Sequence, residues 1–189
     1  MASFQAGAAV FLGVALAAPV LSDTVSDALQ AATEAYAAGD LKAASANVAA
    51  ASAGIAALQS EMLAAFLPEA PAGWTREPTA DFAAGLAMLG GGSGTEMRYT
   101  DAGGGSFAIT IMADNPMVSG MLGIFSSDMM MATMGKVIEV EGAKLIDQEG
   151  TIISVVGQKI LVQASGLDSA TMLPIISAVD FKGLAAFAE

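Results

Sequence analysis

The feature of the sequence that most constrains the fold is a change of pattern at residues 67–73, Leu-Pro-Glu-Ala-Pro-Ala-Gly. Before this stretch, residues 23–66 are rich in alanine and almost free of glycine and proline, which is typical of α-helix. After it, apolar and polar residues alternate, which is typical of β-strands. Because proline cannot continue a helix, the stretch predicts a boundary between a helical part, 23–67, and a second domain, 68–189.

The helical part has one clear interruption, Gly39-Asp40. Glycine allows the left-handed backbone that often follows a helix, and aspartate accepts the free N–H groups at the start of the next one. We therefore expect a helical hairpin with arms near 23–38 and 40–66. In the second arm, steps of three and four predict a packing seam: Leu41, Ala44, Val48, Ala51, Ile55, Leu58, Met62 and Ala65. The expected partners in the first arm are Val25, Ala28 or Leu29, Ala32, and Ala35 or Tyr36.

Several of these residues resemble one tetratricopeptide-type helix pair, in which small residues lie at the helix crossing and Gly-Asp forms the turn: Ala32, Tyr36, Gly39-Asp40, Ala44 and Ala51. No second copy follows at a period of about 34 residues, and Ala56 stands where such a repeat would have its proline. The resemblance implies the shape of a helix pair and a peptide-binding role. The alternative is an ordinary alanine-rich packing hairpin.

The second domain is predicted to be antiparallel and of the α+β class. Residues 96–100 and 106–113 predict a hairpin around a glycine loop, and four further strands are expected at 136–141, 143–148, 151–156 and 159–165. Asn115-Pro116 predicts the start of a helical stretch that runs to Met134 with a break at 126–128. Asp168 and Asp180 are expected to cap two final helices. The predicted fold is thus an N-terminal helical hairpin followed by an antiparallel sheet with inserted and C-terminal helices.

Two further resemblances concern larger parts of the chain. Pro71-Ala72-Gly73-Trp74, followed by the predicted strands and helices, resembles the topology of the PsbP/Mog1 fold. The hairpin, this junction, the Gly90-Gly91-Gly92 loop and the strands together resemble a group of bacterial envelope (periplasmic) proteins, which implies a location but no activity.

The first 22 residues predict a secretory signal peptide. Residues 6–21 carry no charge and are too few to span a bilayer as a helix, which needs about 20. Cleavage is expected after Ala17 or after Ser22. A signal peptide normally begins with basic residues, yet the first one here is Lys42. A misplaced start that omits a basic segment, an uncleaved anchor and a helix of the mature fold therefore all remain open.

No other segment is expected to reach transmembrane length without charge. We therefore expect no integral span in the mature chain, and a periplasmic or secreted location.

The composition excludes several classes of chemistry. The chain has no histidine and no cysteine, which rules out Ser-His-Asp and Cys-His triads, thiolate nucleophiles and His- or Cys-ligated metals. Seven Lys and Arg against 19 Asp and Glu give a net charge of -12, which argues against binding to nucleic acid. We expect no cofactor and no catalytic residues.

Methionine is the unusual local feature, because seven of the 12 lie close together, at positions 112, 117, 121, 129, 130, 131 and 134. Three interpretations stay open: core packing, an apolar patch or groove, and Cu(I) binding by soft thioethers. The patch or groove would comprise Met117, Met121, Phe125, Met129, Met130, Met131 and Met134. The candidate Cu(I) ligands are Met117, Met121, Met130 and Met134, which pair at helical spacing.

Other motifs favour structure over chemistry. The glycine clusters at 90–94 and 103–105 lack the context of a phosphate-binding loop and predict flexible hairpin loops. Glu139 with Glu141, and Asp147 with Glu149, alternate along strands beside turns, which favours a solvated sheet face over an acid and base pair.

The expected function is therefore that of a non-catalytic, exported envelope protein that acts as a binding or accessory module, with an envelope protein as a candidate partner. The alternative is a carrier of an apolar small molecule or Cu(I), and an enzyme of unknown class comes third. A solid core beneath residues 117–134 would favour the module, and a cavity of about 300 Å³ or more there would favour the carrier.

Overall fold

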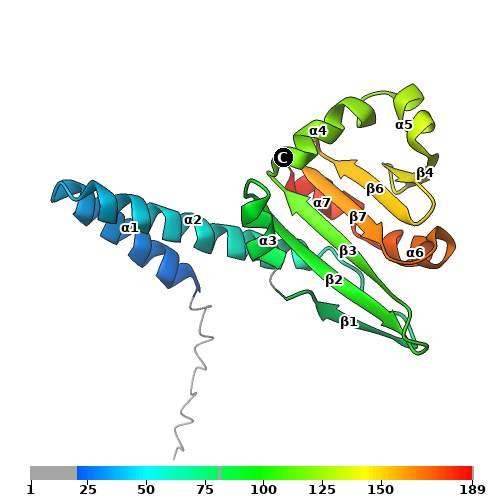
Figure 1. Ribbon diagram of the computed structural model, residues 1–189, viewed down its shortest axis with the longest axis horizontal. Coiled ribbons are helices and arrows are strands. Elements are labelled where there is room, and N and C mark those ends of the chain that lie inside the picture. The colour runs from blue at the N-terminus through cyan, green and yellow to red at the C-terminus, as the bar shows by residue number, and fades with distance from the viewer. Residues whose placement is uncertain (1–20, 81, 189) are drawn as a thin grey trace, which may run out of the picture. The chain divides into compact units, whose positions relative to one another are not determined.

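The computed structural model describes residues 21–80 and 82–188, which form seven helices and one antiparallel sheet of seven strands (Figure 1). The helices are α1 (Leu21–Ala37), α2 (Leu41–Ala64), α3 (Phe82–Met88), α4 (Pro116–Phe125), α5 (Asp128–Met134), α6 (Ser169–Ile176) and α7 (Phe181–Phe187). The strands are β1 (Trp74–Pro78), β2 (Ser93–Asp101), β3 (Ser106–Ala113), β4 (Lys136–Val140), β5 (Ala143–Asp147), β6 (Thr151–Val156) and β7 (Ile160–Ser165). The fold is α+β, with an N-terminal helix pair followed by the sheet and its later helices, as predicted.

The contacts divide the chain into two units, one up to Ala51 and one from Ser52. The division falls within α2 and not at the proline-rich stretch after Leu67. Within the second unit, Leu63 and Leu67 are buried in the main hydrophobic core, so the last turns of α2 belong to the sheet domain by packing.

The first unit contains α1 and the first part of α2, with the turn of the predicted helical hairpin between them. Gly39 has a φ of 80°, the left-handed conformation expected after a helix end. The Asp40 carboxylate accepts a hydrogen bond of 2.9 Å from the backbone N–H of Ala43, as an N-cap does. The turn between the two arms is therefore built as the sequence predicts.

The predicted packing seam of the second arm is only partly correct. Ala44 and Ala51 are buried, but the large members of the seam are exposed: Leu41 by 66%, Val48 by 51%, Ile55 by 44% and Met62 by 57%. On the first arm Ala32 is buried, whereas Leu29 and Tyr36 are exposed. Small side chains let helix backbones approach closely, so the alanines take the buried face and the large side chains lie beside it.

The second unit is organised around the sheet, whose strand order is β1-β2-β3-β7-β6-β5-β4. Strands β4 to β7 form the predicted meander, and β3 pairs with β7 to join it to the β2–β3 hairpin. Glu141 and Gly142, with φ of 49° and 88°, form the two-residue β4–β5 turn. Positive φ at both positions is what a type I′ hairpin turn requires, and it favours glycine.

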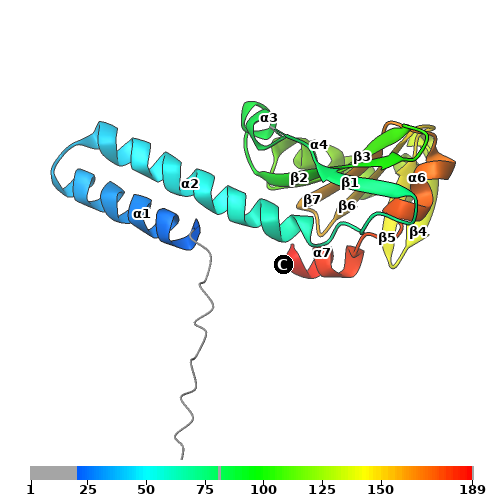
Figure 2. The same cartoon turned by 90° about the horizontal axis from the view of Figure 1, so that it is seen from below.

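Helices cover both faces of the sheet. The larger core lies on the face that packs against α6, α7 and Leu63 and Leu67, and it includes Phe107, Ile109 and Val162. A smaller cluster lies on the opposite face, where Leu86 of α3 and Val118 of α4 are buried. Figure 2 shows the sheet between α7 on one side and α3 and α4 on the other.

Two elements were absent from the sequence prediction. β1 is an edge strand that contains Arg76, Glu77 and Pro78 and pairs only with β2 among the described strands. Its charges and its proline hide the period-two signal, although proline is tolerated at a sheet edge. Helix α3 is short, and the glycines that follow it join it to β2, so Gly90–Gly92 is not the hairpin loop that the sequence predicts.

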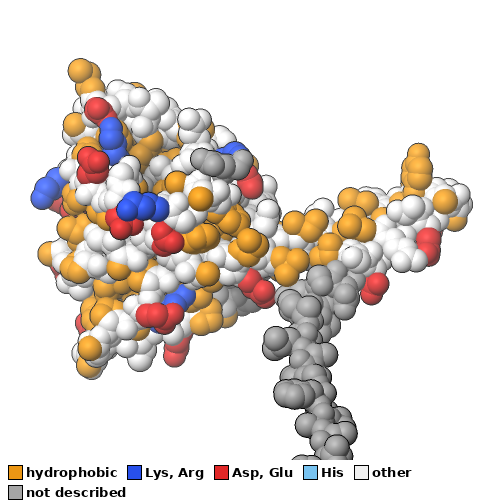
Figure 3. Space-filling model, turned by 180° about the vertical axis from the view of Figure 1, so that it is seen from behind, with side chains coloured by type: hydrophobic (Ala, Val, Ile, Leu, Met, Phe, Trp, Pro, Cys, Tyr) orange, Lys and Arg blue, Asp and Glu red, His pale blue; other side chains and the backbone are white. Residues whose placement is uncertain are grey.

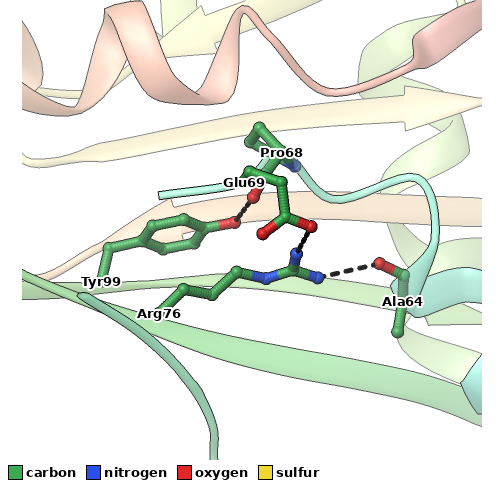
Figure 4. Close-up of polar contacts among 5 residues, drawn as sticks. All are labelled: Ala64, Pro68, Glu69, Arg76 and Tyr99. Carbon is green, nitrogen blue, oxygen red and sulfur yellow. Dashed lines mark hydrogen bonds and ion pairs between the residues drawn. The ribbon is translucent and has the colours of Figure 1, made fainter. Parts of the chain in front are cut away.

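Polar contacts hold the C-terminal end of α2 to the first two strands (Figure 4). Arg76 donates hydrogen bonds to the Ala64 carbonyl (3.1 Å) and to the Glu69 carboxylate (2.8 Å). The Tyr99 hydroxyl donates to the Pro68 carbonyl at 2.7 Å. These bonds satisfy carbonyl groups that a helix end and the loop after it would otherwise leave without donors.

Helix α2 corrects one expectation about membrane segments. Residues 43–60 carry no charge, and α2 is long and apolar enough to cross a membrane, with a mean hydropathy of 1.3 over 18 residues. Helices α6 and α7 pass the same test only as a pair bent by 62°. The expectation that no segment beyond residue 21 reaches such a length is therefore wrong. Composition alone is weak evidence, because core helices pass this test as well.

Replacing Arg76 with methionine should destabilise the sheet domain by about 1–3 kcal/mol, because the Ala64 carbonyl loses its donor while the apolar stem of the side chain is kept. The matched control is Glu69→Gln, which alters an ion-pair partner that is 91% exposed and should cost no more than about 0.5 kcal/mol. Urea unfolding followed by circular dichroism measures both. Equal losses in the two variants would show that the ion pair, and not the bond to the helix end, matters.

Burial raises the pKa of Tyr99 from 10.0 to about 12, with a smaller opposing effect from Arg76. The unfolded chain ionises first, so the stability from Tyr99 is complete below pH 10 and is lost as the pH rises through about 12. Tyr99→Phe should flatten the fall in the free energy of unfolding between pH 10 and 12. It should also lower stability at pH 8 by about 1 kcal/mol, because the bond to Pro68 is lost. An unchanged alkaline slope would contradict this role, and tyrosinate absorbance in a Tyr36→Phe background reports Tyr99 alone.

Candidate functional site

The methionine-rich helices α4 and α5 begin at well-formed caps. The Asn115 side-chain oxygen accepts a hydrogen bond from the backbone N–H of Met117 (2.9 Å), and Pro116 occupies the first helical position. Ser127 accepts from the N–H of Met130 at 3.4 Å. The break at residues 126–128 and both helix starts are thus where the sequence predicts them.

The triple-glycine loop holds the start of α4. Asn115 is buried, and its side-chain amide donates a 2.6 Å hydrogen bond to the carbonyl of Gly91. Gly90, Gly91 and Gly92 all have positive φ, and a Cβ at Gly92 would lie 2.5 Å from the Ala113 carbonyl oxygen. Only glycine fits this approach. The cluster that the sequence predicts as a flexible loop therefore serves as a support for the methionine-bearing helix.

The structure separates the predicted methionines into exposed and buried sets. Four are exposed: Met117 by 47%, Met129 by 79%, Met130 by 48% and Met134 by 42%. Met131 is 1% exposed and Met112 6%, and Met121 is partly buried against the smaller core cluster. We call the four exposed side chains the methionine surface. Met131 and Val118 are buried beneath it, so the helices that carry it are anchored by packing.

The two predicted pairs of Cu(I) ligands differ in their exposure to solvent. Met117 is exposed while Met121 packs inward, so the first pair does not present two thioethers to solvent together. Met130 and Met134 are both exposed on α5, four residues apart. In the part of the chain that the structure describes, no group of three or more Asp or Glu side chains could hold a metal ion. A copper site would depend on Met130 and Met134.

Phe125, at the end of α4, borders an open groove. Two adjoining hollows of about 380 and 410 Å³ share Phe125, Val155 and Gly157 as lining residues. We call them together the Phe125 groove. They lie beside the methionine-bearing helices and open to solvent, so they are not a closed cavity beneath residues 117–134. Phe125 is the predicted site residue that lines this groove, and Met134 lines a separate hollow of about 470 Å³ beside Lys136 and Asp147.

Two lysines line the Phe125 groove, and the sequence prediction did not include them. Lys182 of α7 lies 3.9 Å from the Glu141 carboxylate. Lys144 of β5 donates to Asp128, and this hydrogen bond raises the pKa of Lys144 above its ordinary value. Both lysines give the rim of an apolar groove a polar edge. Basic residues are scarce in this acidic chain, and that scarcity is the one feature of the sequence that could have drawn attention to these two lysines.

The two predicted carboxylate pairs lie at turns and on an edge strand. Asp147 accepts hydrogen bonds from the Ser169 hydroxyl and from the backbone N–H of Glu149 (3.1 Å), which fixes the β5–β6 turn. Glu139 is exposed on the edge strand β4, and Glu141 occupies the next turn. On the face shown in Figure 3, acidic and basic side chains are interspersed among apolar ones, without a patch of one sign.

Comparisons with known proteins add no relative: no family model, no curated protein and no solved structure matches the chain. The tetratricopeptide-like, PsbP/Mog1-like and envelope-protein resemblances therefore stay predictions.

Replacing Asn115 with alanine should remove both the α4 cap and the bond to the glycine loop. We expect a loss of stability of about 1–2 kcal/mol. Amide hydrogen exchange should become faster in residues 90–92 and 116–125 together. Ser127→Ala is the matched control, because it removes a long cap bond of α5 and leaves the loop intact. Faster exchange in α4 with an unchanged glycine loop would contradict the role of Asn115 in joining them.

Proposed function

We propose that the protein is a non-catalytic, exported envelope module that binds an apolar segment of a partner protein on the methionine surface and in the Phe125 groove. The observation that carries this proposal is the exposure of four methionine side chains on two short helices whose buried side is packed. Methionine is flexible and polarizable, so a surface of this kind can adapt to apolar side chains of different shapes. Three of the four, Met129, Met130 and Met134, lie within the single short helix α5, and exposed apolar side chains that are grouped in this way mark interaction sites.

The geometry of the groove supports a protein partner. A hollow of about 400 Å³ has room for one or two large side chains of a bound segment, at the low end of small-molecule sites. The methionine surface extends the contact beyond the groove. Lys144 and Lys182 are paired with Asp128 and Glu141, so an acidic residue of the bound segment would bind by displacing these carboxylates.

Export is the part of the proposal that concerns location. It is supported by the uncharged stretch at residues 6–21, most of which lies outside the described residues. Cleavage after Ser22 would remove the first two described residues of α1, whereas cleavage after Ala17 would remove no described residue. The proposal therefore favours the earlier site.

A second candidate function has its own supporting observation. The Phe125 groove combines apolar walls, including Phe181 and Val156, with two lysines at its rim. This combination suits a small amphipathic carboxylate. The carrier function would then rest on the groove alone, without the methionine surface.

The test is photo-crosslinking in cells, with a photoreactive amino acid in place of Met130 and, as control, in place of the exposed loop residue Ala102. We expect a defined protein adduct from position 130 that is absent from position 102, with its partner identified by mass spectrometry. The purified partner should then bind the variant M117Q/M129Q/M134Q at least ten times more weakly than the natural chain, because polar side chains replace the apolar contact. Adducts that are the same at both positions, or none at position 130, would refute the proposal.

A further inference from the structure

Helix α2 presents a regular row of large apolar side chains to solvent. Leu41, Val48, Ile55 and Met62 are seven residues apart and are exposed by 44–66%. Seven residues are about two helical turns, or about 10.5 Å, so the four side chains lie along one side of the helix. We call this row the α2 stripe. Figure 3 shows apolar side chains along the surface of the helical arm.

The helical hairpin buries few of its own apolar side chains. In the described part of the first unit, the buried side chains are alanines, Ala32, Ala44 and Ala51. An open groove of about 450 Å³ lies between its arms, with Leu29 and Tyr36 on one side and Leu41 and Val48 on the other. A helix pair is stabilised mainly by its packed apolar face, and here the largest apolar groups lie outside that face. The hairpin therefore has the composition of a structure that is completed by another helix.

The spacing of the α2 stripe makes it complementary to a reversed copy of itself. Between the large side chains lie smaller or polar ones, Ser45, Ser52 and Gln59, at steps of four and then three. This alternation has the spacing of a heptad repeat, with large apolar residues at one of the two core positions and small or polar residues at the other. About a two-fold axis near Ala51 and Ser52, Val48 of one helix lies level with Ile55 of the other and Leu41 lies level with Met62, so large apolar side chains meet along the contact.

The charges of α2 favour an antiparallel arrangement. Residues 43–60 are uncharged, and the charged residues of the helix are Lys42 near its start and Glu61 near its end. A parallel pair would bring like charges together at both ends. An antiparallel pair brings the Lys42 end of one copy to the Glu61 end of the other, and it also opposes the two helix dipoles favourably. Because the α2 stripe is uncharged, it has no group that would attract an acidic or basic surface of another protein.

We infer that α2 is a dimerisation helix: two copies of the chain associate through their α2 stripes, antiparallel, with the two-fold axis near Ala51 and Ser52. Each copy uses the same surface, so the contact closes after two chains. The inference is independent of the methionine surface and holds whether or not the proposed partner exists.

The first test measures the mass of the purified full chain by light scattering and sedimentation over a range of concentrations. We expect a dimer whose dissociation constant rises at least 100-fold in V48E/I55E, because four carboxylates would be placed in an apolar contact. The matched control M88E/L89E puts the same charges on two exposed apolar residues outside α2 and should leave the dimer unchanged. Circular dichroism checks that both variants keep their helices.

The second test uses the absence of cysteine from the chain. Under mild oxidation, Ser52→Cys should form a disulfide-linked dimer, because residue 52 lies beside the proposed axis. Ser45→Cys should not, because the two copies of residue 45 would lie about 15 Å apart or more in an antiparallel pair. This comparison needs no destabilising change, since both serines are exposed.

The outcomes separate the alternatives. Efficient cross-linking of Ser45→Cys would overturn the antiparallel arrangement. A monomer at every concentration, or a dimer that V48E/I55E does not weaken, would overturn the inference. Recovery of the full chain only in membranes, with α2 protected from proteases by lipid, would assign the α2 stripe to a bilayer and overturn it as well.

Discussion

The carbonyl groups at the C-terminal end of α2 and in the loop after it impose the constraint on which the sheet domain depends. Each needs a donor, and each finds it in a different element. Arg76 of β1 donates a hydrogen bond to the Ala64 carbonyl, and Tyr99 of β2 donates one to the Pro68 carbonyl. The backbone N–H of Asp180 donates to the Phe66 carbonyl at 3.1 Å. The start of α7 and the first two strands are thereby fixed around one helix end, with Leu63 buried among them.

The two faces of the sheet have different consequences for function. The face covered by α6 and α7 is closed by a large core in which Phe107 stacks on Tyr99 and meets Trp74 edge to face. The opposite face is covered by three short helices. Short helices bury few residues each, so their outer sides stay available. Asn115 joins two of these elements, because it caps α4 and binds the glycine loop that follows α3.

Sequence reasoning succeeded for features that depend on neighbouring residues and failed for features that depend on contacts between distant parts of the chain. Turns and caps such as Gly39-Asp40, Asn115-Pro116 and Glu141-Gly142 are encoded within a few residues, and the structure has them as predicted. Strand β1 could not be found in this way, because it is defined by pairing with β2 and not by its own pattern. The sequence also could not show that Met131 points inward between exposed neighbours, since a run of apolar residues has no periodicity to read. The alanines and not the leucines form the hairpin contact because the two helix backbones approach closely, and the sequence does not show that distance.

The open sheet leaves two edge strands, and each is protected. β1 ends in Glu77 and Pro78, and β4 exposes Lys136 and Glu139. Charges and proline at an edge oppose the addition of another strand. Backbone pairing between sheets of neighbouring molecules is thereby blocked, so a chain that is hydrophobic on average is guarded against fibrous aggregation. Recognition of other molecules is left to side chains on helices, where geometry limits the number of partners.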